Sequence, residues 1–190
     1  MATDISTFKA ALPHGGARPT LFDFRIDKWG ISNGMPPGLV NMKLYCNVSA
    51  IPALTVTPIE RIYFGRTVKI PGDMVFADLT TSLINTENYE VRNGIEEWMA
   101  AINHHSFNVS ENLGDSGDWQ GEATLTQYSK DGSSLMKYKF IGLWPQTLAE
   151  IALSYDTVSD IETFDVTWSY NYYTTTSQGS TLAIPLSEQA

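Results

Sequence analysis

Thr163-Phe164-Asp165-Val166-Thr167-Trp168-Ser169-Tyr170-Asn171-Tyr172 has the plainest pattern in the chain. Aromatic and β-branched residues occupy every second position, and the positions between them are polar. An alternation with a period of two predicts a β-strand, and these residue types suit a pleated surface. Since one face is apolar and the other polar, we expect a sheet with one packed side and one side exposed to water.

This strand closes a larger stretch, residues 138–173, which we interpret as three strands. Residues 150–155 alternate in the same way, and the turn-forming residues 156–160 join them to the last strand as a hairpin. The first strand runs toward Gly142-Leu143-Trp144-Pro145. Because Pro145 cannot donate a hydrogen bond to a neighbouring strand, the first strand stops there or turns a corner.

Similar patterns predict further strands upstream, at 22–26, 61–70, 75–85 and 122–128. Residues 40–48 also alternate, with Met42, Leu44 and Cys46 on the apolar face. We expect an irregular link at 52–58 and a turn at Pro71-Gly72-Asp73, and Gly65 indicates either a bulge or the close approach of another backbone.

One amphipathic helix is predicted over about residues 87–103. Its apolar side chains fall at helical spacing, and Asn85 or Thr86 is expected to cap its start. The chain has 190 residues and no break in composition, which favours one domain. We predict an N-terminal arm (1–17) with a helical turn near Ile5 to Leu12, a β-domain (18–173) and a polar C-terminal tail (174–190). Residues 106–121 are expected to form a long exposed loop.

The composition excludes several classes of function. The net charge is −9, which argues against tight binding of nucleic acid because such binding needs clustered Lys and Arg. No apolar run approaches the roughly 18–20 residues of a membrane span, so no membrane partner is expected. The single cysteine, Cys46, rules out an intramolecular disulfide and is expected to be a small buried hydrophobe rather than a reactive thiol.

No motif for catalysis or cofactor binding is present. His104-His105 are adjacent, which does not place both on one helical face for a metal. The closely spaced aspartates lie in or beside turns, where a structural role is more common than acid–base chemistry. We therefore expect no enzyme activity, no metal and no cofactor. Open sheet edges invite pairing with another chain, which suggests an assembly subunit; the alternative is a monomeric β-barrel that binds a ligand.

Several short motifs, in order and at consistent spacing, resemble the tail tube proteins of T-even-like contractile-tailed bacteriophages. The resemblance covers roughly residues 18–173. The motifs are Arg18-Pro19-Thr20-Leu21-Phe22; Gly72-Asp73 with Phe76, Asp78 and Asn85 leading into the helix that ends near Trp98; Gly142-Leu143-Trp144-Pro145; Glu150-Ile151-Ala152-Leu153; and Ile161-Glu162-Thr163-Phe164-Asp165-Val166-Thr167.

The resemblance implies a mainly β, sandwich or split-barrel tail-tube fold with one helix and a barrel completed by neighbouring subunits. It implies hexameric rings that stack into a tube inside a contractile sheath, ended by baseplate and terminator proteins. Genome DNA would pass through the lumen without specific binding, helped by the acidic charge. The protein would belong to the phage virion and be assembled in the host cytoplasm. A tube subunit of a contractile injection or type VI secretion system is the alternative within the same architecture.

Two sets of residues are predicted to act in assembly. We expect the strand pairs 44–49 with 61–70 and 151–155 with 164–172 to line the lumen. The lumen-facing candidates are Asp165, Thr167, Ser169 and Asn171. The subunit-contact candidates are Arg61, Tyr63, Gly65, Arg66, Gly72 and Asp73.

Overall fold

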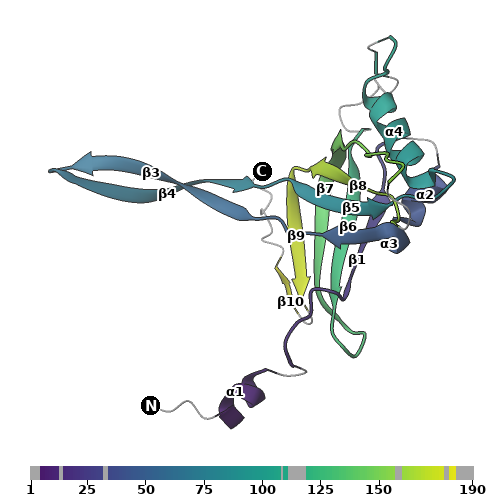
Figure 1. Cartoon of the computed structure of the whole chain (residues 1–190). Helices are drawn as coiled ribbons and strands as arrows, with labels where there is room; N and C mark the ends of the chain where they lie inside the picture. The colour runs from purple at the N-terminus through teal and green to yellow at the C-terminus, as the bar shows by residue number, and fades with distance from the viewer. Residues whose placement is uncertain are drawn as a thin grey trace.

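The structure is a computed structural model that describes residues 5–12, 15–31, 34–107, 109–110, 119–156, 160–177 and 180–182 (Figure 1). The helices are α1 (Ile5–Ala11), α2 (Pro37–Val40), α3 (Met42–Tyr45) and α4 (Glu90–Ile102). The strands are β1 (Phe22–Lys28), β2 (Cys46–Ser49), β3 (Leu54–Tyr63), β4 (Arg66–Phe76), β5 (Leu79–Ile84), β6 (Gly121–Tyr128), β7 (Ser134–Leu148), β8 (Thr163–Ser169), β9 (Tyr172–Ser177) and β10 (Ser180–Leu182). The predicted mainly β class with one longer helix is confirmed.

An 8-stranded antiparallel sheet forms the body, in the order β1-β6-β7-β8-β5-β2, with β9 on β7 and β10 on β9. The long strand β7 belongs to both halves of this sheet. Its first part pairs with β9 up to Ile141, and its last part pairs with β8 from Trp144 onward. The sheet therefore folds over at this point, and the two halves face each other as in a sandwich.

The corner in β7 lies at Gly142, where φ is +72°. A side chain there would collide with the Asn171 amide, because a Cβ would lie 2.3 Å from Asn171 Nδ2. The prediction that the strand stops at Pro145 is wrong, since β7 continues to Leu148 and Pro145 lies opposite Trp168. The alternative, that the chain turns a corner here, is confirmed.

Aromatic side chains fill the space between the halves. Trp168 of β8 lies with its ring centroid 6.1 Å from that of Phe24 of β1 and 6.0 Å from that of Trp98 of α4. All of these side chains are fully buried. The Trp168 Nε1–H donates to Thr81 Oγ1 at 2.9 Å, which satisfies its polar atom inside the core. The predicted packing of the apolar face of 163–172 is confirmed for Phe164, Val166, Trp168 and Tyr170.

Helix α4 covers the end of this core, with Val91, Ile95 and Trp98 buried as its spacing predicts. The predicted cap is wrong. Tyr89, in the left-handed region at φ 54°, precedes the helix, and no side chain caps it. The Asn85 side chain instead donates to Glu162 Oε2 at 3.0 Å and so joins the start of β8 to the end of β5.

The predicted strand at 40–48 is also wrong. The short helices α2 and α3 occupy most of it, and only Cys46–Ser49 is extended. Pro37 sits in the first turn of α2, where a missing N–H costs nothing. Leu39 and Met42 are fully buried while Leu44 is exposed, a spacing of three that fits a helix. Cys46 is half-buried, and burial raises the pKa of its thiol to about 12.

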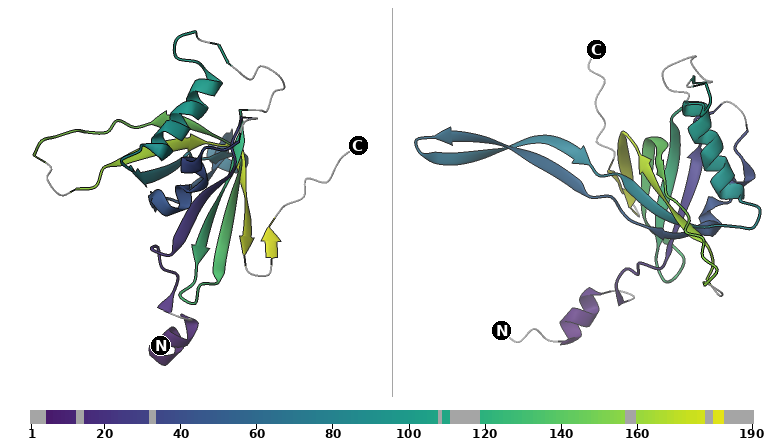
Figure 2. Two further views of the ribbon diagram at one scale, coloured as in Figure 1. Left: turned by 90° about the vertical axis from the view of Figure 1, so that its right-hand side faces the viewer. Right: turned by 45° about the horizontal axis from the view of Figure 1, so that its top comes forward.

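Two further boundaries differ from the prediction. Residues 151–154 are not in a strand, and the segment between β7 and β8 extends away from the sheet (Figure 2). The long final strand is broken by a bend at Tyr170-Asn171 and resumes as β9, so that the predicted division at residue 173 falls inside a strand. After the bend Tyr173, rather than Tyr172, packs against the core.

The expected short helix in the N-terminal arm is confirmed as α1, none of whose residues is buried. The loop expected at 106–121 lies largely outside the described residues. No helix in the described part of the chain combines the length and the apolar character needed to span a bilayer. Within those same residues, no group of three or more His, Cys, Asp or Glu side chains could hold a metal ion.

Candidate subunit-contact surface

The hairpin formed by β3 and β4 projects far from the body (Figure 1). Every residue of β3 and most of β4 are exposed, although many of their side chains are apolar. A hairpin of two strands is marginally stable in water unless something packs on it. The exposed apolar side chains are Leu54, Val56, Ile59, Ile62, Val68, Ile70, Met74 and Val75.

The tip of the hairpin is Phe64-Gly65, between Tyr63 and its partner Arg66. Both tip residues have positive φ, 47° and 76°, as a two-residue turn with the twist of the strands requires. The predicted bulge at Gly65 is therefore wrong. The sequence held the right signal, because Gly at the second position of a turn between two alternating runs is typical of a hairpin.

An irregularity in the register lies halfway along the hairpin. Val56 pairs with Met74 and Pro58 with Pro71, so that Thr57 faces both Gly72 and Asp73. A Cβ on Gly72 would lie 2.5 Å from the Thr57 carbonyl oxygen, which explains why glycine occupies this position. The expectations of a turn at 71–73 and an irregular link at 52–58 are wrong, since these residues lie within β4 and largely within β3.

The outer half of the hairpin has two different faces. One face carries Ile59 opposite Ile70 and Arg61 opposite Val68. The other carries Glu60 opposite Lys69, joined by an ion pair at 3.2 Å. Among the described residues, the structure gives Arg61 and Arg66 no ion pair. The first face is thus apolar with free positive charge at its end, which suits an apolar, acidic partner.

All the predicted subunit-contact residues lie on this one hairpin. Arg61, Tyr63, Gly65 and Arg66 gather at its tip, and Gly72 with Asp73 lies at the irregularity. The predicted strand pairs are wrong, however: β3 pairs with β4, β2 with β5, and β8 with β5 and β7. Sequence reasoning did not include Phe64 among the contact candidates and missed the turn at 64–65, because it treated 61–70 as one strand.

The root of the hairpin is held by an aromatic cluster. Phe76, at the end of β4, lies 6.1 Å from Tyr170 and 5.4 Å from Tyr173 between ring centroids. The Tyr170 hydroxyl donates to the Ala77 carbonyl oxygen at 2.7 Å. Burial, with the nearby Tyr173 and Asp78 charges, raises the pKa of Tyr170 to about 12. These contacts fix the direction in which the hairpin leaves the body.

The predicted lumen residues lie on the polar face of β8 and just beyond its end. Asp165 is exposed, and Thr167 and Ser169 are half-buried. Asn171 lies at the corner, where its amide packs over Gly142 and donates to Gln120 Oε1 at 3.4 Å. Asn171 therefore has a structural role in addition to its predicted one.

A second polar face, which sequence reasoning did not single out, lies across β1, β6, β7 and β9. Arg25 pairs with Asp27 at 2.8 Å, and Lys139 pairs with Glu122 at 2.7 Å. The hydrogen bond from Lys139 to Glu122 raises the pKa of Lys139. In the described residues β1 pairs with β6 alone, so one side of β1 is an open edge. The alternation of Asp23, Arg25 and Asp27 with apolar residues was the signal for this face.

Comparisons with known proteins agree with this architecture. The profile of the phage tail tube protein family matches residues 8–176. The tail tube protein gp19 of Enterobacteria phage T4 is 27% identical over 158 residues, which cover 83% of this chain and 90% of that protein.

Solved structures share the fold. One is the sheath/tube terminator of an extracellular contractile injection system, PVC, in the extended state: its TM-score is 0.57 at 15% identity, and the match covers 83% of this chain and 94% of that chain. Another is from the six-fold symmetrised baseplate of the anti-feeding prophage, with a TM-score of 0.62 at 6% identity over 86% of this chain and 97% of that chain.

Proposed function

This chain belongs to the phage tail tube protein family, a structural component of the contractile phage tail, and we propose that its copies form stacked hexameric rings that enclose a channel for genome DNA. The proposal includes assembly in the host cytoplasm and no enzymatic role. A tube subunit of a contractile injection or secretion system would use the same contacts, and the match to the T4 tail tube protein favours the phage tail.

The exposed apolar surface of the β3–β4 hairpin is the main observation that supports this proposal. Apolar side chains are exposed along both strands, and the described body offers them no cover. Burial of apolar surface is worth about 25 cal/mol per Å², so a second copy that covers this face stabilises both itself and the hairpin. The candidates Arg61, Tyr63, Gly65, Arg66, Gly72 and Asp73 are the proposed contact residues.

The open edges of the body also support a ring. The β1–β6–β7–β9 half ends in β1 on one side and in β9 with β10 on the other. If the β1 edge of one copy pairs with the far edge of the next, the ring closes without free edges. The structural relative from a baseplate of six-fold symmetry makes six copies the first number to test.

Two polar faces are candidates for the wall of the channel. The first is the β8 surface with Asp165, Thr167, Ser169 and Asn171; the second is the β1–β6–β7–β9 face, whose open edges favour it. In either case a protein of net charge −9 repels phosphate, so DNA slides through rather than binds.

Matched charge variants distinguish the two faces. Asp165→Lys adds positive charge to the first face and Thr176→Lys adds it to the second, where Thr176 is an exposed partner of Lys137. The variant that faces the channel slows DNA ejection from assembled virions and the other leaves the ejection rate unchanged. If both variants eject at the native rate, neither face forms the wall.

Tail partners are proposed by analogy with the relatives. One structural relative is a sheath/tube terminator and another is from a baseplate, which supports contacts of this chain with sheath, baseplate and terminator proteins. Co-assembly of purified chain with sheath protein tests the sheath contact.

Negative-stain electron microscopy of the purified full chain tests the central proposal. Rings or tubes with six-fold symmetry are the expected result. A chain that stays monomeric at high concentration would instead favour the alternative class, a monomeric ligand-binding β-barrel.

A further inference from the structure

We propose that the ring of Phe64, at the tip of the β3–β4 hairpin, inserts into a small apolar pocket on a second copy of the chain. Its apolar lining comes from Pro19, Phe22, Ile51, Leu125 and Tyr138, and Ser49 and Gln127 add polar groups. The inference rests on the proposed self-assembly, and it names the two surfaces that meet.

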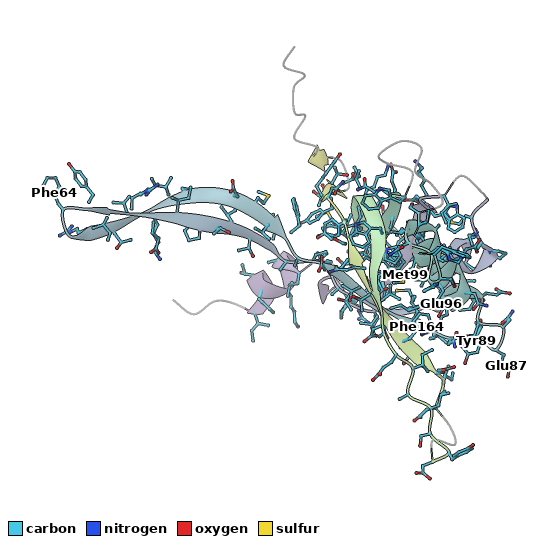
Figure 3. The ribbon with its side chains drawn as sticks, turned by 90° about the horizontal axis from the view of Figure 1, so that it is seen from above. Phe64, Glu87, Tyr89, Glu96, Met99 and Phe164 are labelled. Atoms are coloured by element: carbon cyan, nitrogen blue, oxygen red, sulfur yellow. The ribbon has the colours of Figure 1, made fainter. Side chains whose placement is uncertain are left out.

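Phe64 is displayed at the tip. Its side chain is 90% exposed, and it lies at the far end of the hairpin, away from every element of the body (Figure 3). Its φ of 47° is unusual for a bulky residue that is not glycine, and such strain is found where function requires it. The neighbouring Tyr63 ring packs edge-on at 4.5 Å between centroids and limits its motion. The aromatic ring is therefore presented in a restricted orientation.

The pocket has the size and the chemistry for one aromatic ring. Its cavity volume is about 180 Å³, and an apolar cavity of about 150 Å³ is known to accept benzene. Its walls come from the start of β1, from β6, from β7 and from the link between β2 and β3. The Ser49 hydroxyl is buried there, and no group among the described residues forms a hydrogen bond with it. An unsatisfied buried hydroxyl is costly, and the backbone of an inserted tip offers it a partner.

The contact between Phe64 and the pocket joins two copies, because the hairpin cannot reach the pocket of its own chain. The hairpin points away from the body that carries the pocket (Figure 1). The charge also fits a second copy, since the tip carries Arg61 and Arg66 whereas the chain as a whole has a net charge of −9. A basic tip is attracted to an acidic copy of its own chain.

The N-terminal helix α1 offers the competing occupant. Phe8 is also an exposed aromatic residue, and the arm that carries it joins the body at Pro19, beside the pocket. Phe64 is favoured because the hairpin holds it in place, whereas α1 buries none of its residues and must lose the freedom of its tether on docking.

Cysteine cross-linking tests which residue occupies the pocket. In a Cys46→Ala background, Phe64→Cys is combined with Ile51→Cys, a half-exposed residue at the pocket rim, and assembled protein is treated with a short bis-maleimide. The expected result is a ladder of covalent oligomers on a denaturing gel. The control combines Ile51→Cys with Tyr155→Cys, which is fully exposed on another segment, and is expected to give no ladder. An absence of intermolecular product from the Phe64 pair in assembled protein overturns the proposal, as does an intramolecular product from Phe8→Cys with Ile51→Cys.

Association measurements provide the second test. Phe64→Ala weakens association by about 10- to 100-fold, the loss expected for an aromatic ring that no longer becomes buried. Ile51→Trp fills the pocket from its rim and gives a similar loss, and the double variant is no weaker than either single variant because both remove the same contact. Circular dichroism and thermal melting of the monomers check that each variant is folded.

The outcomes separate this inference from the proposed function. Rings that form equally well from native protein, Phe64→Ala and Ile51→Trp overturn the pocket assignment and leave self-assembly intact. Native protein that never associates contradicts self-assembly itself, and the inference with it.

Discussion

The body and the β3–β4 hairpin are built from the same kind of alternating sequence, and they differ in where its apolar side chains lie. In β8 the alternate residues Phe164, Val166 and Trp168 are buried between two sheet halves. In β3 every residue is exposed. The difference teaches that alternation predicts a strand with an apolar face, but not which molecule covers that face. The body supplies its own cover, whereas in the proposed assembly another copy covers the hairpin.

The largest expected effect is a loss of stability in the body. Trp168→Ala removes a fully buried ring and leaves the Thr81 hydroxyl without its donor, so the free energy of unfolding falls by about 3–5 kcal/mol. Urea denaturation of the monomer measures it. Ile62→Ala, on the hairpin, is the control and changes monomer stability by less than about 0.5 kcal/mol. A similar loss for both variants would contradict the division between body and hairpin.

Two glycines with similar positive φ angles sharpen the comparison. Gly142 in the body and Gly65 at the hairpin tip have φ of 72° and 76°. Alanine is strained at both, but only Gly142→Ala also drives a Cβ to 2.3 Å from the Asn171 amide. We expect Gly142→Ala to lower the free energy of unfolding by about 1–3 kcal/mol.

Gly65→Ala is expected to leave the melting of the monomer unchanged and to weaken assembly, because the turn it strains lies outside the body. Thermal melting and sedimentation of the two variants, side by side, give the measurement. A body that melts earlier with Gly65→Ala than with Gly142→Ala would show that the tip contributes to the monomer fold.

The smallest effect concerns the junction of the two regions. Tyr170→Phe removes the hydrogen bond to Ala77 and costs about 0.5–1.5 kcal/mol. Because the folded protein raises the pKa of Tyr170 from 10.0 to about 12, the folded state favours the neutral hydroxyl. This stabilisation is present below pH 10 and is lost as the pH rises through the window from 10 to 12.

Urea denaturation of native protein and of Tyr170→Phe across this alkaline range checks whether the Tyr170 contribution to stability falls as the pH rises. The native protein loses stability more steeply with rising pH than the variant does. Parallel curves would mean that Tyr170 does not titrate differently in the folded state.

Much of the body could be predicted from the sequence, because its strands and α4 pack against partners within the chain. The alternation of 163–170 and the helical stripe of α4 appear in the structure as expected. Residues 40–48 gave a wrong prediction, since Leu39 and Met42 fit a helix while the neighbouring residues also fit a strand. The corner at Gly142 depends on Asn171, which is distant in sequence, so only its Gly-Leu-Trp-Pro signature was visible.

The predicted contact residues remain a prediction, and the shape of the surface that carries them was not foreseen. The sequence singled out Arg61, Gly65 and Gly72 as contacts, and the structure places all of them on the hairpin. It did not indicate that 54–76 forms one ribbon, because Pro58, Pro71 and Gly72 are typical of turns. In the hairpin these residues are tolerated at the register irregularity, where the ladder of hydrogen bonds is already interrupted.

Hydrogen exchange of the full chain, measured once as monomer and once after assembly, tests the central claim most directly. The account predicts that amides of β3 and β4 exchange quickly in the monomer and become strongly protected in the assembly, while amides of β6 and β8 are protected in both. Hairpin amides that are already as protected in the monomer as those of β8, or that remain unprotected in assembled tubes, would contradict it.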